Sequence, residues 1–193
     1  MNITIPEDRT FEGFGKIARA QKAMGCVITE KIDGTNAQIV IENGEIVAVG
    51  SRKRWIAPGK TTDNYGFAGW VERNYQTLVG LGDGVHFGEW YGSGIQSGYG
   101  LRDGDKRFAL FNTDRWFDGN PPPTPCEVVP VLYRGEFTAN VLRDTMEELQ
   151  TNGSVIQPGF MKPEGVIVWL YGSRMFLKST FDHPEGKWTA EAA

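Results

Sequence analysis

The twelve residues TEKIDGTNAQIV (29–40) contain the feature on which the interpretation of this chain depends. Apolar residues on either side of Gly34 predict two β-strands separated by a tight break. In an extended strand, Lys31 and Asp33 point to one face, whereas Glu30 points to the other. Such a charged stretch is either a solvated strand end at a turn or the reactive centre of an enzyme.

The composition is that of an ordinary globular protein, with 40% apolar and 23% charged residues among 193. This length suits one domain, so we expect residues 1–193 to form a single unit. Cys26 and Cys126 match neither a disulfide framework nor a zinc site. No run has the length of a membrane span or the core of a signal peptide. We therefore expect a cytoplasmic location.

The net charge of −4 argues against a protein that binds nucleic acid by electrostatic attraction alone. The basic run SRKRW (51–55) leaves room for a local basic groove, although three cations in a row are more typical of a solvated loop. Charge by itself therefore defines no binding partner.

Strands dominate the apolar pattern, and helices occur among them without regular alternation, which predicts an α+β fold. Asn43-Gly44 predicts a type I′ hairpin. Asp63 is expected to cap a helix with an apolar stripe from Phe67 to Leu78, ended by Gly80. The other expected elements are helices at 16–24 and 139–150, strands at CVITE (26–30), GVHFGEW (84–90), KRFALFN (106–112) and EVVPVLY (127–133), a Gly-rich loop at 92–104, and two strands around Tyr171-Gly172.

Lys31 can act as a nucleophile only when its amine has lost its proton. A free lysine has a pKa of about 10.4, so about one molecule in a few thousand is neutral at pH 7. Burial, a second cation or a metal lowers this pKa, and a shift to roughly 7–8 costs about 3–4 kcal/mol. A neighbouring carboxylate favours the ammonium, so we expect a Lys31–Asp33 ion pair that is released when metal and substrate arrive.

Four further charged side chains stand at the edges of apolar strands: Arg52, Glu89, Glu164 and Lys178. Each one alone is more typical of an ordinary strand end. Together they form the ordered set Lys-x-Asp-Gly, Arg, Glu, Glu-Gly, Lys. This set predicts a nucleotide pocket lined by strands of two facing sheets.

The ordered motifs resemble those of the covalent nucleotidyltransferase superfamily, and in particular the small, phage-encoded ATP-dependent RNA ligases. The matching segments, from about residue 26 to 180, are EKIDGTN, GSRKRW, FGEWYG, RFALFN, PEGVIV and FLKS. The resemblance implies an ATP-grasp-like domain of facing antiparallel sheets flanked by helices. It further implies ATP and Mg²⁺ or Mn²⁺ as cofactors, and RNA with 5′-phosphate and 3′-hydroxyl ends as the partner. A phage enzyme would act in the host cytoplasm.

The resemblance also assigns roles to single residues. Lys31 would attack the α-phosphate of ATP to form a lysyl–AMP adduct, with Asp33 and Lys178 as further catalytic residues. Glu164 would hold the divalent metal, and Lys178 would contact the α-phosphate. The remaining nucleotide-binding residues would be Glu30 at the adenine edge, Asn36 as an organiser of phosphate or metal, Arg52 and Glu89 at the ribose or a phosphate, and Phe111 stacked on adenine, with Phe108 as the alternative.

The chain departs from the family pattern in two places. Phe176 stands where the fifth motif usually carries its first lysine, so one phosphate-contacting cation is missing unless Arg174, Lys53 or a second metal substitutes. Only fifteen residues follow Lys178, so we expect no C-terminal OB-type domain.

Two other functions compete with RNA ligation. A capping-type guanylyltransferase would use GTP through the same lysine chemistry, although DGTN lacks the arginine common at that place in capping enzymes and DNA ligases. A catalytically weak nucleotide- or RNA-binding module would explain Phe176. The retention of Lys31, Glu89, Glu164 and Lys178 favours an active enzyme.

Overall fold

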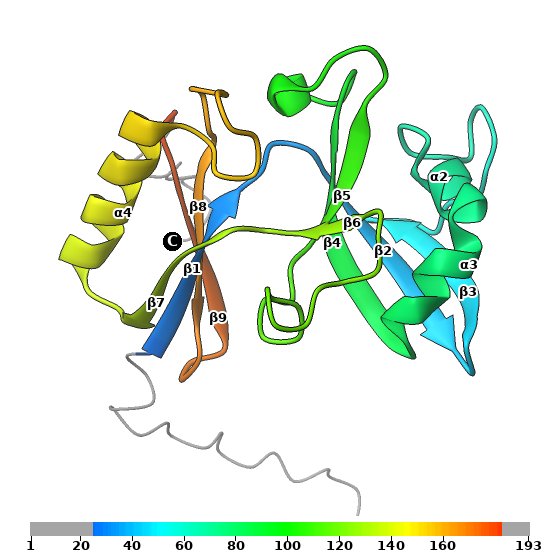
Figure 1. The fold of residues 1–193 in the computed structure, drawn as a ribbon, viewed down its shortest axis with the longest axis horizontal. Coiled ribbons are helices and arrows are strands. Elements are labelled where there is room, and N and C mark those ends of the chain that lie inside the picture. The colour runs from blue at the N-terminus through cyan, green and yellow to red at the C-terminus, as the bar shows by residue number, and fades with distance from the viewer. Residues whose placement is uncertain (1–24, 183–193) are drawn as a thin grey trace, which may run out of the picture.

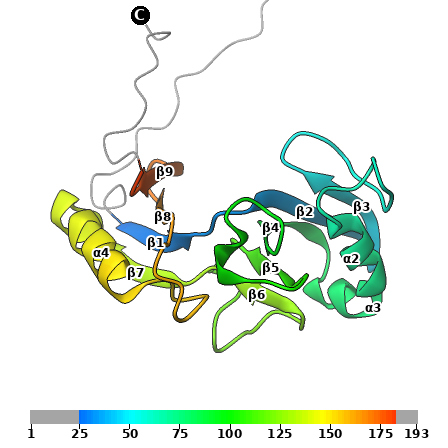
Figure 2. The ribbon, with the colours of Figure 1, turned by 90° about the horizontal axis from the view of Figure 1, so that it is seen from above.

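A computed structural model describes residues 25–182, which form two β-sheets lying side by side with helices on their outer faces (Figures 1 and 2). Sheet A has the order β7 (Val131–Glu136), β1 (Gly25–Lys31), β8 (Gly165–Leu170) and β9 (Met175–Thr180). Sheet B has the order β3 (Glu45–Ser51), β2 (Thr35–Glu42), β4 (Gly84–Gly92), β5 (Lys106–Leu110) and β6 (Cys126–Val128). The α+β class is confirmed, and the helix expected at 16–24 lies outside the described residues.

Each sheet buries one face under helices. On sheet B, Trp90 and Phe108 pack against Phe67 of α2 (Phe67–Arg73), with ring centroids 5.3 and 4.9 Å from that of Phe67. On sheet A, Ile28 shares a buried cluster with Leu149 of α4 (Ala139–Asn152). The other two faces are left for the functional groups. A third cluster lies where the chain connects the sheets and consists of Ile32, Tyr91, Tyr99, Leu101, Ala109 and Val129.

The hairpin expected at Asn43-Gly44 is confirmed. These two residues connect β2 to β3 with φ angles of 54° and 76°. Positive φ at both central positions defines a type I′ turn, whose twist matches that of the flanking strands. Asp83 further holds the turn, because its carboxylate accepts hydrogen bonds from both backbone amides.

The helical segment that begins at Phe67 is not one helix ended by Gly80, as expected. It is divided into α2, α3 (Tyr75–Leu78) and the 3₁₀ helix η1 (Val79–Leu81), and it ends at Gly82. The side-chain amide of Asn74 donates a 2.8 Å hydrogen bond to the carbonyl of Trp70. An asparagine that bonds to its own backbone in this way competes with regular helix hydrogen bonding.

Asp63 caps α2, as expected from the sequence. Its two carboxylate oxygens accept hydrogen bonds from the amides of Ala68 (2.8 Å) and Gly69 (3.0 Å) in the first turn. We expect Asp63→Ala to lower the free energy of unfolding by about 1–2 kcal/mol, because both amides then lose their acceptor. Urea unfolding measures this change, and Asp63→Asn, which keeps one oxygen, should cost less. An equal cost for both variants would contradict a capping role.

EVVPVLY was expected to be one strand but belongs to two. Val128 ends β6 in sheet B, and Val131 begins β7 in sheet A. Between them, Pro130 has no amide hydrogen to donate to a strand neighbour, and its carbonyl accepts from Glu30 N at 3.0 Å. The expected antiparallel sheets are confirmed for most strand pairs, and the exception is β6, which pairs with β5 in parallel.

Candidate active site

Lys31 is the last residue of β1, at the point where the chain leaves sheet A. It pairs in register with Gly165 of β8, which places its side chain beside Glu164. The Lys31 Nζ atom lies 2.5 Å from Glu164 Oε2, and both side chains are about three-quarters buried. The expected ion pair with Asp33 is wrong, since Asp33 Oδ2 accepts a hydrogen bond from Ser97 N at 3.1 Å instead. Strand pairing thus gives Lys31 a partner that is 133 residues away in sequence, Glu164, in place of Asp33, which is only two residues away.

Gly34 lets the segment that follows Lys31 pass close to β4. A Cβ atom at this position would lie 2.5 Å from the carbonyl oxygen of Trp90 and 2.8 Å from Tyr91 Cβ. Real Cβ atoms essentially never approach other atoms so closely. The glycine therefore allows the inner faces of the two sheets to meet at Lys31.

Glu89 is the functional group that sheet B brings to this meeting point. It pairs in register with Asn36, whose side-chain amide donates a 2.8 Å hydrogen bond to Glu89 Oε2. Burial raises the pKa of Glu89 to about 7, and the nearby Glu164 adds to the increase, while Lys31 and Asn36 oppose it. Two carboxylates from different sheets thus act on one lysine.

The pKa of Glu89 predicts a pH-dependent stability. Between the ordinary value of 4.5 and about 7, the folded chain holds a proton that the unfolded chain releases. Stability therefore falls as the pH rises through this interval, by up to about 3 kcal/mol at about 1.36 kcal/mol per unit. Urea unfolding in a chelating buffer at pH 4.5, 6 and 7.5 should show this loss relative to Glu89→Gln. Parallel pH profiles for the two proteins would refute it.

The carboxylates suit a divalent cation of the Mg²⁺ type. Such ions keep several waters and bind through one or two protein carboxylates together with substrate phosphates. Glu89 and Glu164 provide two carboxylates, and the charge of Glu164 adds to the increase in the pKa of Glu89 that burial mainly causes. Residues 25–182 contain no group of three or more His, Cys, Asp or Glu that could enclose a metal by themselves. These carboxylates therefore fit a metal ion that is also bound by substrate phosphates and water better than a metal ion bound by protein side chains alone.

Glu30 is almost completely buried on the other face of β1, with 1% of its surface exposed. Its Oε1 accepts a 2.6 Å hydrogen bond from the hydroxyl of Tyr99, and its Oε2 accepts from the amides of Val155 (2.8 Å) and Ile156 (3.2 Å). These contacts connect β1 to the Gly-rich loop at 92–104 and to the segment after α4. The nucleotide role of Glu30 stays a prediction, and its observed contacts are within the protein.

The two candidates for stacking on adenine, Phe108 in β5 and Phe111 directly after it, face opposite sides of sheet B. Phe108 is fully buried in the core of sheet B, where it packs against Phe67 and Trp70. Phe111 is 39% exposed, and its amide donates to the carbonyl of Phe87, which is itself 54% exposed. Phe111 can thus offer a ring face to a ligand, whereas Phe108 cannot. Its role as the adenine-stacking residue stays a prediction.

The remaining predicted residues lie at the edges of the two sheets. Arg52 follows β3 directly and is exposed. Lys178 is exposed on the edge strand β9. It pairs in register with Ile167 of β8, and Ile167 pairs with Thr29 of β1. Directly paired residues share a sheet face, so Lys178 lies on the same face of sheet A as Lys31.

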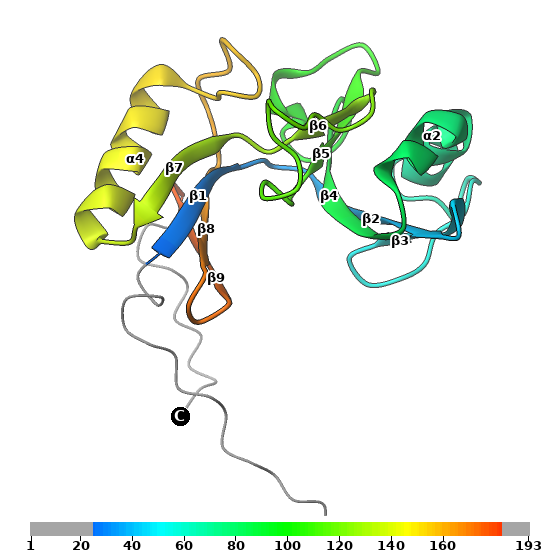
Figure 3. The same cartoon turned by 60° about the horizontal axis from the view of Figure 1, so that its bottom comes forward.

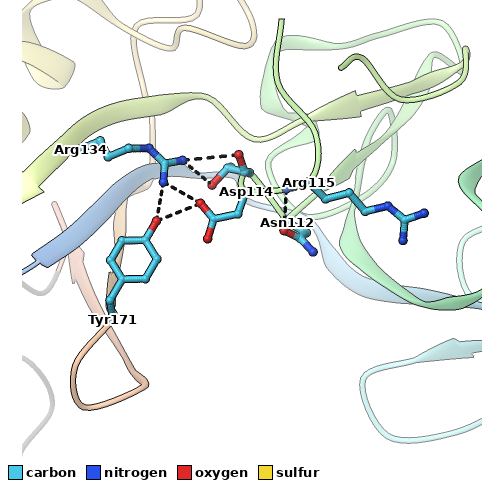
Figure 4. Close-up of polar contacts among 6 residues, drawn as sticks. Asn112, Asp114, Arg115, Arg134 and Tyr171 are labelled. Carbon is cyan, nitrogen blue, oxygen red and sulfur yellow. Dashed lines mark hydrogen bonds and ion pairs between the residues drawn. The ribbon is translucent and has the colours of Figure 1, made fainter. Parts of the chain in front are cut away.

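One polar cluster was not anticipated from the sequence (Figure 4). Asp114 follows β5 and accepts from Arg134 of β7 at 2.6 Å and from the Tyr171 hydroxyl at 2.9 Å. Arg134 also bonds to Thr113 and to the Tyr171 hydroxyl. This cluster fastens the segment after Phe111 to sheet A. The sequence offered no signal for it, because its hydrogen-bonded partners are 20 to 57 residues apart.

A lysine that ends a strand between two sheets, with carboxylates from both, defines a nucleotidyltransferase-type domain. The family model for RNA ligase matches residues 25–179. The chain therefore belongs to the RNA ligase family. No curated protein sequence matches it at a significant level.

Solved structures of the RNA ligase from Naegleria gruberi have the same fold. A Lys-to-Met variant with AMP and Mn has a TM-score of 0.58 and 18% sequence identity, over 84% of this chain and 51% of that one. The same protein with PPi has a TM-score of 0.56 and 18% identity, over 92% and 57%. The present chain thus spans about half the length of these proteins. No helix within residues 25–182 is long and apolar enough to cross a membrane.

Proposed function

We propose that this protein is an ATP-dependent RNA ligase of the small phage type, with an ATP-grasp-like nucleotidyltransferase domain. It seals RNA 5′-phosphate and 3′-hydroxyl ends through a lysyl–AMP intermediate. The observation that carries this proposal is the position of Lys31, at the end of β1 and in contact with Glu164, in a chain of the RNA ligase family. The neighbouring inner face of sheet B supplies Glu89, Asn36 and the exposed ring of Phe111.

In the first step, the deprotonated Nζ of Lys31 attacks the α-phosphorus of ATP. A P–N bond forms, the P–O bond to the β-phosphate breaks, and pyrophosphate leaves on the side opposite the lysine. Glu164 Oε2 contacts the Nζ atom, so this contact must be released before the attack. Lys178, on the same sheet face, would offset charge on the α-phosphate.

Glu164, together with Glu89, would hold the divalent metal. When bound, this ion supplies positive charge to the phosphate oxygens during transfer. Asn36 orients the carboxylate of Glu89 through its 2.8 Å hydrogen bond, while Phe111 stacks on the adenine and Arg52 lies at the ribose or a phosphate. Each residue thereby positions the substrate or stabilises charge that develops in the transition state.

In the second step, an RNA 5′-phosphate attacks the lysyl–AMP phosphorus, and Lys31 leaves as the amine. In the third step, a 3′-hydroxyl attacks the activated 5′-phosphate and releases AMP. We place the RNA near the exposed residues Arg52, Lys53 and Arg54 and the Gly-rich loop at 92–104. The first segment follows β3, which pairs with β2 and so lies beside the strand of Asn36, and the second follows β4, which carries Glu89.

The test is to incubate the purified protein with Mg²⁺ or Mn²⁺ and either ATP or GTP labelled on the α-phosphate. We expect label from ATP to remain on the protein after denaturation, and to move to RNA carrying a 5′-phosphate but not to RNA carrying a 5′-hydroxyl. Label from GTP alone would favour a capping-type guanylyltransferase. Absence of label from either nucleotide would favour the weak binding module that Phe176 suggests.

A further inference from the structure

An aromatic pair occupies the inner face of sheet A, outside the residues that the proposed mechanism uses. Trp169 of β8 and Phe176 of β9 are register partners, and their ring centroids are 4.4 Å apart with an interplanar angle of 40°. Phe176 is 67% exposed, the largest exposed fraction among the large apolar side chains described. Exposing an aromatic ring in this way loses the burial that normally stabilises it.

The pair lies on the reactive face of the sheet. Trp169 pairs with Val27 of β1, and alternate residues of a strand share a face, so Val27, Lys31, Trp169, Phe176 and Lys178 all belong to one face. Phe176 is two residues from Lys178, or roughly 6–7 Å along β9. An exposed aromatic surface therefore borders directly on a cation proposed to contact phosphate.

We propose that Trp169 and Phe176 form a stacking platform for a nucleobase at the 5′-phosphate end of the RNA substrate. Aromatic rings beside cations are the usual means by which proteins hold single-stranded nucleic acid, since rings stack on bases while cations contact phosphates. Phe176, where a second cation was expected, would thus contribute binding to RNA instead of binding to ATP. This inference specifies a substrate contact within the proposed function and rests on it.

The positions of the exposed rings favour RNA over the adenine of ATP as the occupant. The exposed rings suited to adenine, Phe111 and Phe87, belong to sheet B, whereas Phe176 is on the far edge strand of sheet A. Two strand spacings, or roughly 10 Å, separate β9 from β1. The platform thus lies on the opposite side of Lys31 from Phe111, the proposed adenine contact.

The first measurement compares RNA binding by wild type, Phe176→Ala and Phe176→Trp, using fluorescence anisotropy with a short single-stranded 5′-phosphorylated RNA. We expect Phe176→Ala to weaken binding about 5- to 50-fold, because base–aromatic stacking is worth about 1–3 kcal/mol. Phe176→Trp should retain binding. Lysyl–AMP formation from ATP should stay within about twofold of wild type in both variants.

The matched control is Met175→Ala, which removes an exposed apolar side chain from the adjacent position on the opposite face of β9. A second control uses RNA with an abasic 5′-terminal nucleotide. If Phe176 stacks on that base, the abasic RNA binds wild type more weakly, and Phe176→Ala adds no further loss. Equal losses for Met175→Ala and Phe176→Ala would overturn the proposal and indicate that β9 contacts another part of the protein or a protein partner.

The same measurements separate this proposal from the proposed function. Lysyl–AMP formation by wild type, with RNA binding unchanged in Phe176→Ala, would overturn the platform and leave the ligase intact. Weaker RNA binding by Phe176→Ala in a protein that forms no lysyl–AMP would support the platform while refuting the ligase. A loss of lysyl–AMP formation in Phe176→Ala, with normal RNA binding, would overturn the platform by assigning Phe176 to the ATP step.

Discussion

Lys31→Arg should abolish covalent labelling of the protein by ATP, with a loss of more than about 1,000-fold. Arginine keeps the positive charge opposite Glu164, so the local electrostatics and the fold should be preserved. The guanidinium stays protonated at all accessible pH values and has no lone pair suited to attack on phosphorus. The loss therefore reports on the nucleophile alone. The measurement is retention of α-phosphate label after denaturation, at equal protein concentration.

Lys60→Arg is the matched control, because Lys60 is exposed in the loop after β3 and is not among the residues assigned to the nucleotide. It should label at the wild-type rate. Lys31→Arg should also fail to ligate RNA when supplied with ATP, although RNA that is already adenylylated at its 5′ end bypasses the first step and should still be joined. Undiminished label on Lys31→Arg would assign the adduct to a different side chain.

Glu30→Ala should lower the free energy of unfolding by about 3–5 kcal/mol. The substitution leaves the buried Tyr99 hydroxyl and the amides of Val155 and Ile156 without their common acceptor. Hydrogen bonds to a charged group contribute about 1.5–3 kcal/mol each, and an unsatisfied buried donor adds a desolvation cost. Since domains of this kind are stable by only about 5–15 kcal/mol, the variant should unfold at a much lower urea concentration.

Tyr99→Phe provides the comparison, because it removes one of the three donors and no acceptor. We expect it to cost about 1–2 kcal/mol, well below the cost of Glu30→Ala. Glu30→Gln, which keeps one carbonyl oxygen, should fall between them. If the alanine and phenylalanine variants were equally destabilised, the two amides would not depend on Glu30. A raised KM for ATP in the folded Glu30→Gln protein would support the adenine contact implied by the family resemblance.

Local signals in the sequence were sufficient for most secondary elements. The type I′ turn depends on two adjacent residues that tolerate positive φ, and the cap of α2 depends on one carboxylate a few residues before the helix. The helix expected at 139–150 corresponds to Ala139–Asn152. In each case the determining interaction lies within about six residues, so the pattern alone contains it.

The wrong predictions concern contacts between segments that are distant in sequence, and strand boundaries and register that the pattern of apolar residues does not reveal. Lys31 pairs with Glu164 because β1 lies beside β8, and nothing local to Lys31 indicates that neighbour. The apolar run around Pro130 has the pattern of one buried strand, although its two halves belong to different sheets. Phe108 and Phe111 are separated by an odd number of positions, so along a strand they face opposite sides. The sequence does not say which side is buried, and the structure places Phe108 in the core and Phe111 on the surface.

The chain passes between the two sheets only twice within residues 25–182, after Lys31 and after Val128. The two connections touch, since the amide of Glu30 donates to the carbonyl of Pro130 at 3.0 Å, and Figure 3 shows them running together. A buried cluster that includes Ile32 and Val129 packs at the same two connections. The end of β1 is therefore held by two segments of chain that come from distant parts of the sequence, so the position of the Lys31 amine depends on both crossings and not on one strand end alone.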